Sequence, residues 1–533
     1  MAKADQVTPA AATGRRPLRD QLSTGLAARL VRAVVTGSHA QHVKIAAPYT
    51  GEVLVELPQS VPGDVQLAFE RARKAQARWA AKPVAERAAV MYRFHDLLLA
   101  HREELLDLIQ AESGKARWHA FEEFADTVTC TRHYARRVAG YLRPRRRGGA
   151  LPLLTRTAEL RQPVGVVGII SPWNFPLSLP VTDAVPAFLA GNAVVLKPDN
   201  QTVLAMLRAR ELMIQSGLDD QLWQVVAGDG PVIGPALIDH ADHVAFTGST
   251  RTGRQVAQQA AYGLTGSSLE LGGKNPLIVL DDADLDRTVE GAVAACFSAA
   301  GQSCVTTERI YVRHEIYREF TERFAERVRR LSISTGLDYS GDLGSLTVPR
   351  QLEQVTAHVE DAKAKGAKVL AGGRHRPDLG PLCYEPTVLI GVNRGMRVCR
   401  EETFGPVVSV YPVKSDEDAV LKANDTEYGL NASVWTKNTR RGRAVAARIR
   451  AGSVGVNDGY AAAWGSSGAP MGGMGQSGLG RRHGAEGIWR YTEAQTIAVQ
   501  RLLPIGPVLG LGYRGTANLL TGVLRALRAL RAG

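Results

Sequence analysis

The sequence predicts an α/β protein with two domains, each built on a parallel sheet. After Pro163, short apolar strands alternate with helical segments, beginning with strands expected at 164–170, 193–196 and 224–226. Such alternation is typical of βαβ units and of a parallel sheet. A second cycle of the same kind begins with a strand expected at 277–280. We therefore expect two α/β domains in succession.

A helical block precedes the first of these strands. Asp64 is the expected N-cap residue, and apolar residues recur at helical spacing from there through Phe124, with a break at Pro83. The segment 143–152 is rich in arginine and proline and loses that spacing, which indicates an extended connector. The glycine-rich stretch 465–484 is too long for one turn, and we expect an ordered loop near a functional site.

Composition and charge limit the class of protein. The chain has 533 residues, of which 45% are hydrophobic and 22% are charged, as in ordinary globular proteins. Its net charge of +13 includes arginine clusters at 15–19, 143–147 and 525–531, but no nucleic-acid-binding motif accompanies them. The five cysteines give no disulfide framework, which is typical of the reducing cytoplasm. We expect a cytoplasmic protein that has no metal site and does not bind nucleic acid.

The two ends of the chain differ from the rest. The first twenty or so residues are polar, lack the apolar run of a signal peptide and are expected to be mobile. Near the C-terminus, Leu520, Val523, Leu524 and Leu527 share one face of a helix expected at 517–531. This face could pack on the protein's own body, on another subunit or weakly on a membrane surface, and the sequence leaves these alternatives open.

Three side chains could carry out chemistry. Cys304 follows a predicted helix in a loop of small residues, where a substrate could reach its thiol. Glu270 lies between apolar residues and beside two glycines, where burial would raise its pKa into the range that suits a general base. Asn174 stands among prolines and aromatic residues after a strand, and its amide could donate to an oxyanion. Taken singly, each also fits an ordinary structural role, such as a buried thiol or an asparagine in a turn.

A fourth segment, 246–253, follows a strand and enters a helix, so its backbone N–H groups could bind a phosphate. Its glycines, Gly248 and Gly253, match neither the GxGxxG fingerprint nor a Walker A loop. The segment by itself therefore does not identify a nucleotide site.

Six motifs follow one another in a fixed order along the chain. They are SPWNFP at 171–176, GNAVVLKP at 191–198, FTGSTRTG at 246–253, ELGGKNP at 270–276, GQSC at 301–304 and EETFGP at 401–406. In this order they closely resemble the aldehyde dehydrogenase superfamily, over about residues 45 to 500. The segments 115–118, 464–466 and 471–484 most resemble an actinobacterial-type succinate-semialdehyde dehydrogenase.

The resemblance implies an aldehyde dehydrogenase-like fold, with two Rossmann-like α/β domains and a small β oligomerisation arm. It suggests an N-terminal tail at 1–44, a cofactor-binding domain at 45–142 and 161–272, a catalytic domain at 273–490, an arm at 143–160 and 491–503, and an amphipathic C-terminal tail at 504–533. It also implies a homodimer or homotetramer formed partly through the arm.

The resemblance implies NAD(P)-dependent oxidation of an aldehyde to a carboxylic acid. Cys304 would be the nucleophile, forming a thiohemiacetal and then a thioester, and Glu270 would be the general base. The Asn174 side chain and the Cys304 backbone N–H would stabilise the oxyanion. Retention of all three residues argues against a relative that has lost catalysis, and Glu270 argues against the branch that transfers the acyl group to CoA.

The same resemblance assigns a cofactor site. Lys197 would hydrogen-bond the adenosine ribose, Glu402 would hold the nicotinamide ribose and Phe404 would pack beside it. The other cofactor-binding positions are Ser171, Trp173, Asn200, Gly248, Ser249, Gly253 and Leu271.

Asn200 bears on the choice between NADP and NAD. Many NAD-specific members of the family carry a glutamate three residues after the lysine, and its carboxylate would repel a 2′-phosphate. The neutral Asn200 therefore favours NADP, while the charge of the adjacent Asp199 keeps NAD possible.

The expected substrate is succinic semialdehyde, which would be oxidised to succinate. Bacterial enzymes of this type hold its carboxylate with two arginines, but here Thr182 and Ser298 occupy those positions. Arg481, Arg482 or His483 could replace them. The alternative is a fatty or other apolar aldehyde, with the C-terminal amphipathic helix resting on a membrane.

Overall fold

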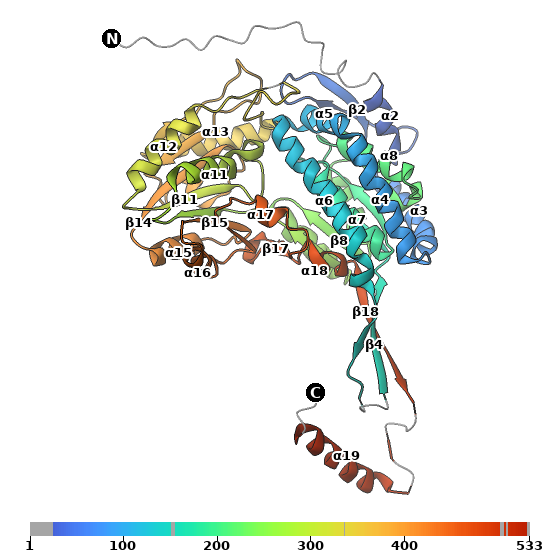
Figure 1. Ribbon diagram of the computed structural model, residues 1–533. Helices are drawn as coiled ribbons and strands as arrows, with labels where there is room; N and C mark the ends of the chain where they lie inside the picture. The colour runs from blue at the N-terminus through green and yellow to red at the C-terminus, as the bar shows by residue number, and fades with distance from the viewer. Residues whose placement is uncertain (1–24, 151–154, 335, 502–505, 508–509, 530–533) are drawn as a thin grey trace, which may run out of the picture.

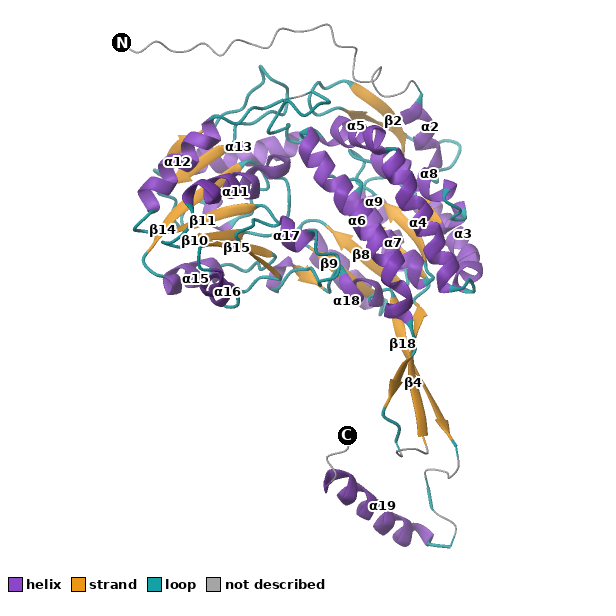
Figure 2. Ribbon diagram, viewed as in Figure 1, coloured by secondary structure: helices purple, strands orange, loops and turns teal. Residues whose placement is uncertain are grey.

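The computed structural model describes residues 25–150, 155–334, 336–501, 506–507 and 510–529. The N-terminal residues that the sequence predicts to be mobile lie outside the described part of the chain. Two lobes lie side by side, a narrow β arm projects from one of them, and a C-terminal helix lies beyond the tip of the arm (Figure 1). Figure 2 shows that helices cover a sheet in each lobe.

The first lobe contains a six-stranded sheet with the order β17-β9-β8-β5-β6-β7. Its strands are β5 (Val166–Ile170), β6 (Ala193–Lys197), β7 (Trp223–Val225), β8 (His243–Thr247), β9 (Gly266–Glu270) and β17 (Gly478–Leu479). All are parallel except β17, which pairs antiparallel with β9. The continuous apolar runs of the inner strands suit burial on both faces. β17 comes from late in the chain and extends this sheet beside Glu270.

Helices pack on both sides of this sheet, and those within residues 62–142 form the predicted helical block. They are α2 (Leu26–Leu30), α3 (Pro62–Ala80), α4 (Val84–Ala100), α5 (Arg102–Ser113), α6 (Arg117–Leu142), α7 (Ser178–Ala190), α8 (Leu204–Gln215), α9 (Gly230–His240) and α10 (Thr250–Tyr262). A hairpin of β1 (His42–Ala46) and β2 (Val53–Pro58) precedes α3. The expected N-cap was wrong: α3 begins at Pro62, and Asp64 in its first turn accepts a hydrogen bond from the Val61 N–H at 2.9 Å. Proline suits the first turn because no N–H is needed there.

The second lobe contains a seven-stranded sheet with the order β12-β13-β14-β11-β10-β15-β16. Its strands are β10 (Asn275–Val279), β11 (Thr307–Arg313), β12 (Lys368–Ala371), β13 (Thr387–Ile390), β14 (Val407–Val413), β15 (Asn431–Trp435) and β16 (Ser453–Val456). Only the edge strand β12 is antiparallel to its neighbour within this sheet of the described chain. Its helices are α11 (Leu285–Phe297), α12 (Tyr317–Arg329), α13 (Pro349–Ala364), α14 (Arg397–Arg400), α15 (Asp416–Asn424), α16 (Thr439–Ala446) and α17 (Ala461–Trp464). Helix α18 (Gly484–Trp489) packs instead on α6 and α7 of the first lobe. The predicted α/β class, with two mainly parallel sheets, is confirmed.

The arm is a three-stranded antiparallel sheet with the order β18-β4-β3. It consists of β3 (Arg145–Arg147), β4 (Thr155–Pro163) and β18 (Thr492–Gln500). The predicted connector is thus partly a strand. Beyond the arm, α19 (Gly512–Ala529) forms the C-terminal helix in the region where the amphipathic pattern predicts one.

Candidate active site

The carboxyl ends of the first sheet bring together several residues singled out from the sequence. Asn174 lies in the turn after β5, Lys197 ends β6, Gly248 follows β8 and Glu270 ends β9. In an open parallel sheet, ligands bind outside the carboxyl ends of the strands, where the strand order reverses direction. That reversal occurs here on the two sides of β5, which lies between β8 and β6.

The amino ends of the second sheet supply the remaining residues. Cys304 lies just before β11, while Glu402 and Phe404 lie just before β14. The Asn275 amide donates to the carbonyl oxygens of Cys304 and Thr306, at 2.7 and 2.8 Å. Since Asn275 opens β10 shortly after Glu270, these bonds join the segment after Glu270 to the Cys304 loop.

The Cys304 loop begins with a tight turn in the short 3₁₀ segment Ser298–Gly301. Ala299 and Ala300 have φ angles of 51° and 54°, in the left-handed region that alanine rarely adopts. Gly301 follows with a φ of 72°, and a Cβ there would overlap the Gly405 backbone. Backbone strain of this kind persists where the surroundings impose it, often at functional sites.

Asn174 is held against this loop. Its Nδ2 atom donates to the Gln302 carbonyl oxygen at 2.9 Å. The turn after Asn174 is fixed by Glu123, whose Oε1 atom accepts hydrogen bonds from the N–H groups of Leu177 and Ser178 at 2.7 and 3.1 Å. Glu123 is also paired with the buried Lys115. A buried charged network therefore holds the turn after Asn174. The Asn174 amide contacts the carbonyl of Gln302, the second residue before Cys304.

Glu270 is 7% exposed, and its Oε1 atom has no hydrogen-bond partner among the described residues. Burial raises its pKa to about 7. Gly472 approaches so closely that an added Cβ would lie 3.0 Å from Oε1. The expectation that the glycine-rich stretch 465–484 lies near a site is thus met by this contact. A buried carboxyl that titrates near neutrality can accept a proton at physiological pH.

The Cys304 thiol is partly exposed, whereas Cys130, Cys296 and Cys383 are buried. Burial of the sulfur raises the pKa of Cys304 to about 12, and the negative charges of Glu270 and Glu402 contribute to the rise. The thiol is therefore protonated at neutral pH in this structure. Nucleophilic attack requires a base to accept its proton.

The side chains assigned to the adenosine end of a cofactor retain free polar atoms. The Lys197 ammonium is 7% exposed and donates to the Pro198 carbonyl oxygen at 3.1 Å, and burial lowers its pKa. Asn200 donates to Gln59 Oε1 at 3.0 Å, while its Oδ1 atom is unpartnered within the described residues. Ser249 caps α10 by accepting from the Thr252 N–H, so the N-terminus of a 13-residue helix faces this region.

Hydrogen bonds and a ring contact fix the segment that ends in Phe404. Glu402 Oε1 accepts a hydrogen bond from the Gly273 N–H at 2.7 Å, and burial raises the Glu402 pKa to about 8. Phe404 has a φ of 54°, and its N–H donates to the buried Glu308 at 2.9 Å. The rings of Phe404 and Trp173 meet edge to face at 5.6 Å, which joins the two lobes.

The remaining cofactor positions contact these elements. A Cβ on Gly253 would overlap the Leu271 side chain, so this glycine lets α10 pack closely on the segment after β9. The Leu271 N–H donates to the Ser477 carbonyl oxygen at 3.0 Å. The Ser171 N–H donates to the Lys197 carbonyl oxygen at 3.1 Å. All the residues predicted for the site thus lie at the facing ends of the two sheets.

A cavity of about 230 Å³ leads to the Cys304 loop and is lined by Ser303 and by Phe175, the residue after Asn174. Aromatic and acidic side chains both line it, and the residues of its walls include Trp118, Phe121, Tyr460 and Trp464 as well as His119, Glu122, Glu123, Asp126 and Ser298. Of the described residues, no lysine or arginine lines it. The Tyr460 hydroxyl lies 3.0 Å from Glu122 Oε2 and 2.7 Å from Ser298 Oγ. Sequence analysis found only Ser298 among these polar groups.

The three residues suggested as a replacement for the missing arginines lie elsewhere. Arg482 is buried and paired with Asp183, which also pairs with Arg490. Arg481 donates to the carbonyl oxygens of Gly473 and Gly480. His483 is buried, and burial lowers its pKa to about 3. None of these three described side chains lines the cavity at Cys304, so the structure does not support them as a carboxylate clamp.

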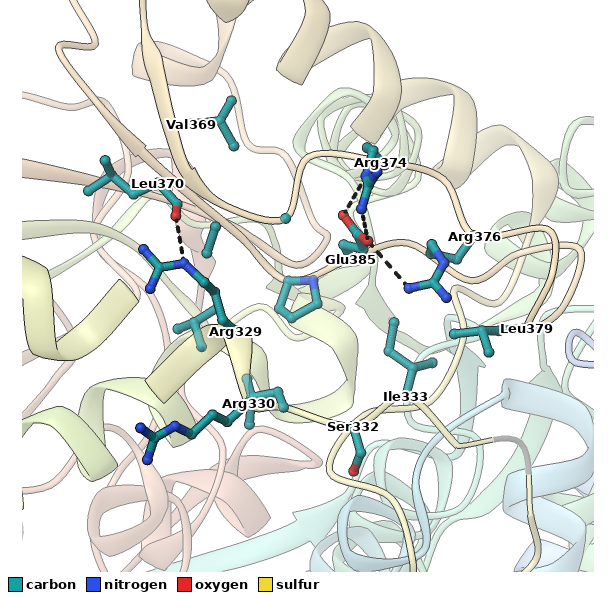
Figure 3. A pocket seen from close by; sticks show the side chains of 15 residues that line it. Arg329, Arg330, Ser332, Ile333, Val369, Leu370, Arg374, Arg376, Leu379 and Glu385 are labelled. Carbon is teal, nitrogen blue, oxygen red and sulfur yellow. Dashed lines mark hydrogen bonds and ion pairs between the residues drawn. The ribbon is translucent and has the colours of Figure 1, made fainter. Parts of the chain in front are cut away.

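A second cavity, of about 710 Å³, lies in the second lobe between the end of α12 and strand β12 (Figure 3). Arg374 and Arg376 both pair with Glu385, and Arg329 donates to the Leu370 carbonyl oxygen. It includes none of the residues predicted for the site. Its charged groups already have protein partners, so we assign it no role.

The described residues contain neither a metal-binding cluster nor a membrane-spanning helix. No cluster of three or more His, Cys, Asp or Glu side chains is arranged to hold a metal ion in the part of the chain that the structure describes. Among the described helices, none has the length and apolar character that a membrane span requires.

The chain was compared with known proteins. Residues 34–497 match the aldehyde dehydrogenase family. A Mycobacterium tuberculosis protein named provisionally as succinate-semialdehyde dehydrogenase [NADP(+)] 2 is 52% identical over 90% of this chain and 93% of its own length. A mitochondrial succinate-semialdehyde dehydrogenase of Arabidopsis thaliana is 39% identical over 86% of each chain. The crystal structure of an aldehyde dehydrogenase from Brucella melitensis biovar abortus is similar, with a TM-score of 0.84 and 34% identity, over 88% of this chain and 96% of that one. These matches confirm the resemblance and the predicted fold class: the chain belongs to the aldehyde dehydrogenase family.

Proposed function

We propose that this protein oxidises an aldehyde to a carboxylic acid with NADP as the electron acceptor, and that its substrate is succinic semialdehyde. The single observation that carries the reaction is the convergence of Cys304, Glu270 and Asn174 at the facing ends of the two sheets. The mycobacterial relatives named for this substrate and for NADP support the narrower assignment.

The first half of the reaction uses Cys304 and Asn174. After the thiol proton passes to solvent water, the sulfur attacks the aldehyde carbon, a C–S bond forms and the carbonyl oxygen becomes an oxyanion. The Asn174 amide and the Cys304 N–H are the donors that stabilise this oxyanion. When the carbonyl re-forms, the carbon loses a hydride and a thioester remains on Cys304. The bound nicotinamide supplies the acceptor for that hydride.

The second half uses Glu270. Its carboxylate removes a proton from water, the resulting nucleophile attacks the thioester carbon, and the C–S bond breaks to release the acid and the Cys304 thiolate. The raised pKa of about 7 suits this role, because the same group can take and return a proton near neutral pH.

We propose that Lys197, Glu402 and Phe404 hold the cofactor, together with the N-terminus of α10. The fit rests on polar atoms that the protein itself leaves available: the Lys197 ammonium, which has two further protons to donate, and the Asn200 Oδ1 atom. The positive end of a helix dipole favours a phosphate at α10. Neutral Asn200 leaves room for the additional phosphate of NADP, whereas NAD remains a usable second cofactor.

Changing Asn200 to glutamate should lower kcat/KM for NADP by at least about tenfold, because a carboxylate there repels the 2′-phosphate. Initial rates measured with each cofactor check this prediction, and Asn200→Gln is the control that keeps the amide. The rate with NAD should change much less than the rate with NADP. An equal loss with both cofactors, or no loss with NADP, would contradict the assignment.

We further propose that His119 and Ser298 recognise the substrate carboxylate. Both line the cavity at Cys304, and the buried His119 Nδ1 atom has no hydrogen-bond partner among the described residues. Burial lowers the pKa of His119 to about 4. An arriving carboxylate favours the protonated ring and thus raises that pKa in the complex.

Changing His119 to glutamine should raise KM for succinic semialdehyde by at least about tenfold, since a charged hydrogen bond is lost. KM for butanal, which has the same chain length and no carboxylate, should stay within about twofold of its original value. Steady-state kinetics with both aldehydes make the comparison, and His314→Gln, an exposed histidine outside the cavity, is the control. If KM rises equally for the two aldehydes, His119 shapes the cavity but does not bind the carboxylate.

We propose the domain assignment of the family for this chain, with the arm joining subunits of a homodimer or homotetramer. The exposed side chains Ile497 and Val499 on β18 support this, because a partner subunit would bury them. The five unpaired cysteines fit a reducing cytoplasm.

A further inference from the structure

The C-terminal helix α19 lies outside the residues that match the family, which end at 497. Figure 1 shows α19 beyond the tip of the arm, away from both lobes. Neither the dehydrogenase chemistry nor the two sheets account for this helix.

The two sides of α19 differ in chemistry. One side carries Leu520, Val523, Leu524 and Leu527, spaced by three and four residues, so they form one apolar stripe. Arg514, Arg525 and Arg528 are separated by eleven and three residues, which places them together on another side. The helix is therefore strongly amphipathic, with only arginines as its charged residues over Gly512–Ala529.

The described part of the protein's own body covers the apolar stripe only in part, because Leu520 and Leu527 are half-buried. Leu524 is 67% exposed and Val523 is 39% exposed, and neighbouring Leu519 is 49% exposed. Of the alternatives that the sequence left open, full burial of the stripe against the same chain is therefore not what the described residues show. Exposed apolar surface of this kind marks an interaction site.

The charge of the tail indicates the partner. Residues 501–533 contain five arginines and no aspartate or glutamate. Such a segment is attracted to an anionic surface, and an arginine-rich amphipathic helix suits the interface of an anionic bilayer. An 18-residue helix is about 27 Å long, and no described helix has the character of a membrane span, so it would lie along the surface.

We propose that α19 binds the surface of a membrane containing anionic lipids. Its apolar stripe enters the boundary between headgroups and acyl chains, and Arg514, Arg525 and Arg528 contact lipid phosphates. The helix thereby holds the two lobes at the bilayer through the arm. The proposal does not depend on which aldehyde the enzyme oxidises.

The test is co-sedimentation of the purified full-length protein with vesicles of phosphatidylcholine alone or with about 30% phosphatidylglycerol. We expect binding to the anionic vesicles that weakens in 0.5 M salt and is at least about tenfold weaker on neutral vesicles. Arg525→Glu with Arg528→Glu should reduce binding to anionic vesicles at least about tenfold. Val523→Gln with Leu524→Gln should do the same, because that variant removes part of the apolar stripe.

Arg318→Glu with Arg330→Glu is the matched control, since it makes the same change of net charge at exposed positions on or beside α12. This variant should bind like the unchanged protein, and all variants should keep their dehydrogenase activity in solution. Light scattering without vesicles measures the oligomer mass in parallel. The proposal would be overturned if the full-length protein did not bind, or if the control lost binding equally. A change of oligomer mass in the Val523/Leu524 variant would also overturn it, by showing that a second copy covers the stripe.

Discussion

Replacing Cys304 by alanine should lower kcat for aldehyde oxidation by at least about 10⁴-fold, while the protein stays folded. The thiol supplies the atom that forms the bond to the aldehyde carbon, and no neighbouring group among the described residues can take over that bond. The loop around Cys304 is fixed by hydrogen bonds to its backbone, such as the one that the Asn275 side-chain amide donates to the Cys304 carbonyl oxygen, which the substitution leaves in place. Initial rates of NADP reduction measure the effect.

Cys399→Ala is the control, because Cys399 is the other described cysteine that is partly exposed. It should keep its activity within about threefold, and both variants should keep the original melting temperature within a few degrees. Full activity in the Cys304 variant would show that Cys304 is not the nucleophile. Equal losses of kcat in both variants would show that the substitutions disturb the fold and do not remove a nucleophile.

Replacing Glu270 by glutamine should lower steady-state kcat by about 10²- to 10⁴-fold, the range expected for loss of a general base. Hydrolysis of the thioester should be the step that slows. Rapid mixing should therefore show a burst of NADPH of about one equivalent per subunit, followed by slow turnover. Glu322→Gln, an exposed substitution on α12, should leave both phases unchanged. A Glu270 variant with slow turnover and no burst would place Glu270 in the first half of the reaction instead.

The pH dependence of kcat gives a second measure of Glu270. The base works in its ionised form, and burial raises its pKa to about 7, so protonation removes activity as the pH falls through that value. We expect kcat to rise between about pH 6 and pH 8 and then to level off. The Glu270→Gln variant should lose this rise. A rise that persists in the variant would belong to another group.

The sequence predicts the strands well where local and tertiary preferences agree. The buried strands β5 and β6 are continuous apolar runs, and the predicted segments overlap them closely. Asp64 shows the limit of local reasoning, because it fits an N-cap but acts from the third helical position after Pro62. The pairing of β17 with β9 joins residues more than 200 positions apart and is too short to leave a pattern.

The site residues were predicted because motifs and chemistry pointed to the same positions, and their roles stay a prediction. The groups that support them were missed, because each depends on contacts distant in sequence. Glu123 reaches the turn after Asn174 from α6, and Tyr460 meets Ser298 across 162 positions. A buried charge such as Lys115 looks like a surface residue until its partner is known. The suggestion that Arg482 binds the substrate carboxylate lacks support for the same reason. Its side chain is paired with Asp183, and this pairing is visible only in the fold.

The most direct test of the account compares initial rates of NADP reduction with succinic semialdehyde and with octanal, an apolar aldehyde of medium length. The account predicts a kcat/KM at least about tenfold higher for succinic semialdehyde, which corresponds to roughly 1.4 kcal/mol of transition-state stabilisation. An equal or higher value for octanal would contradict it, and would mean that the aromatic cavity at Cys304 selects apolar aldehydes.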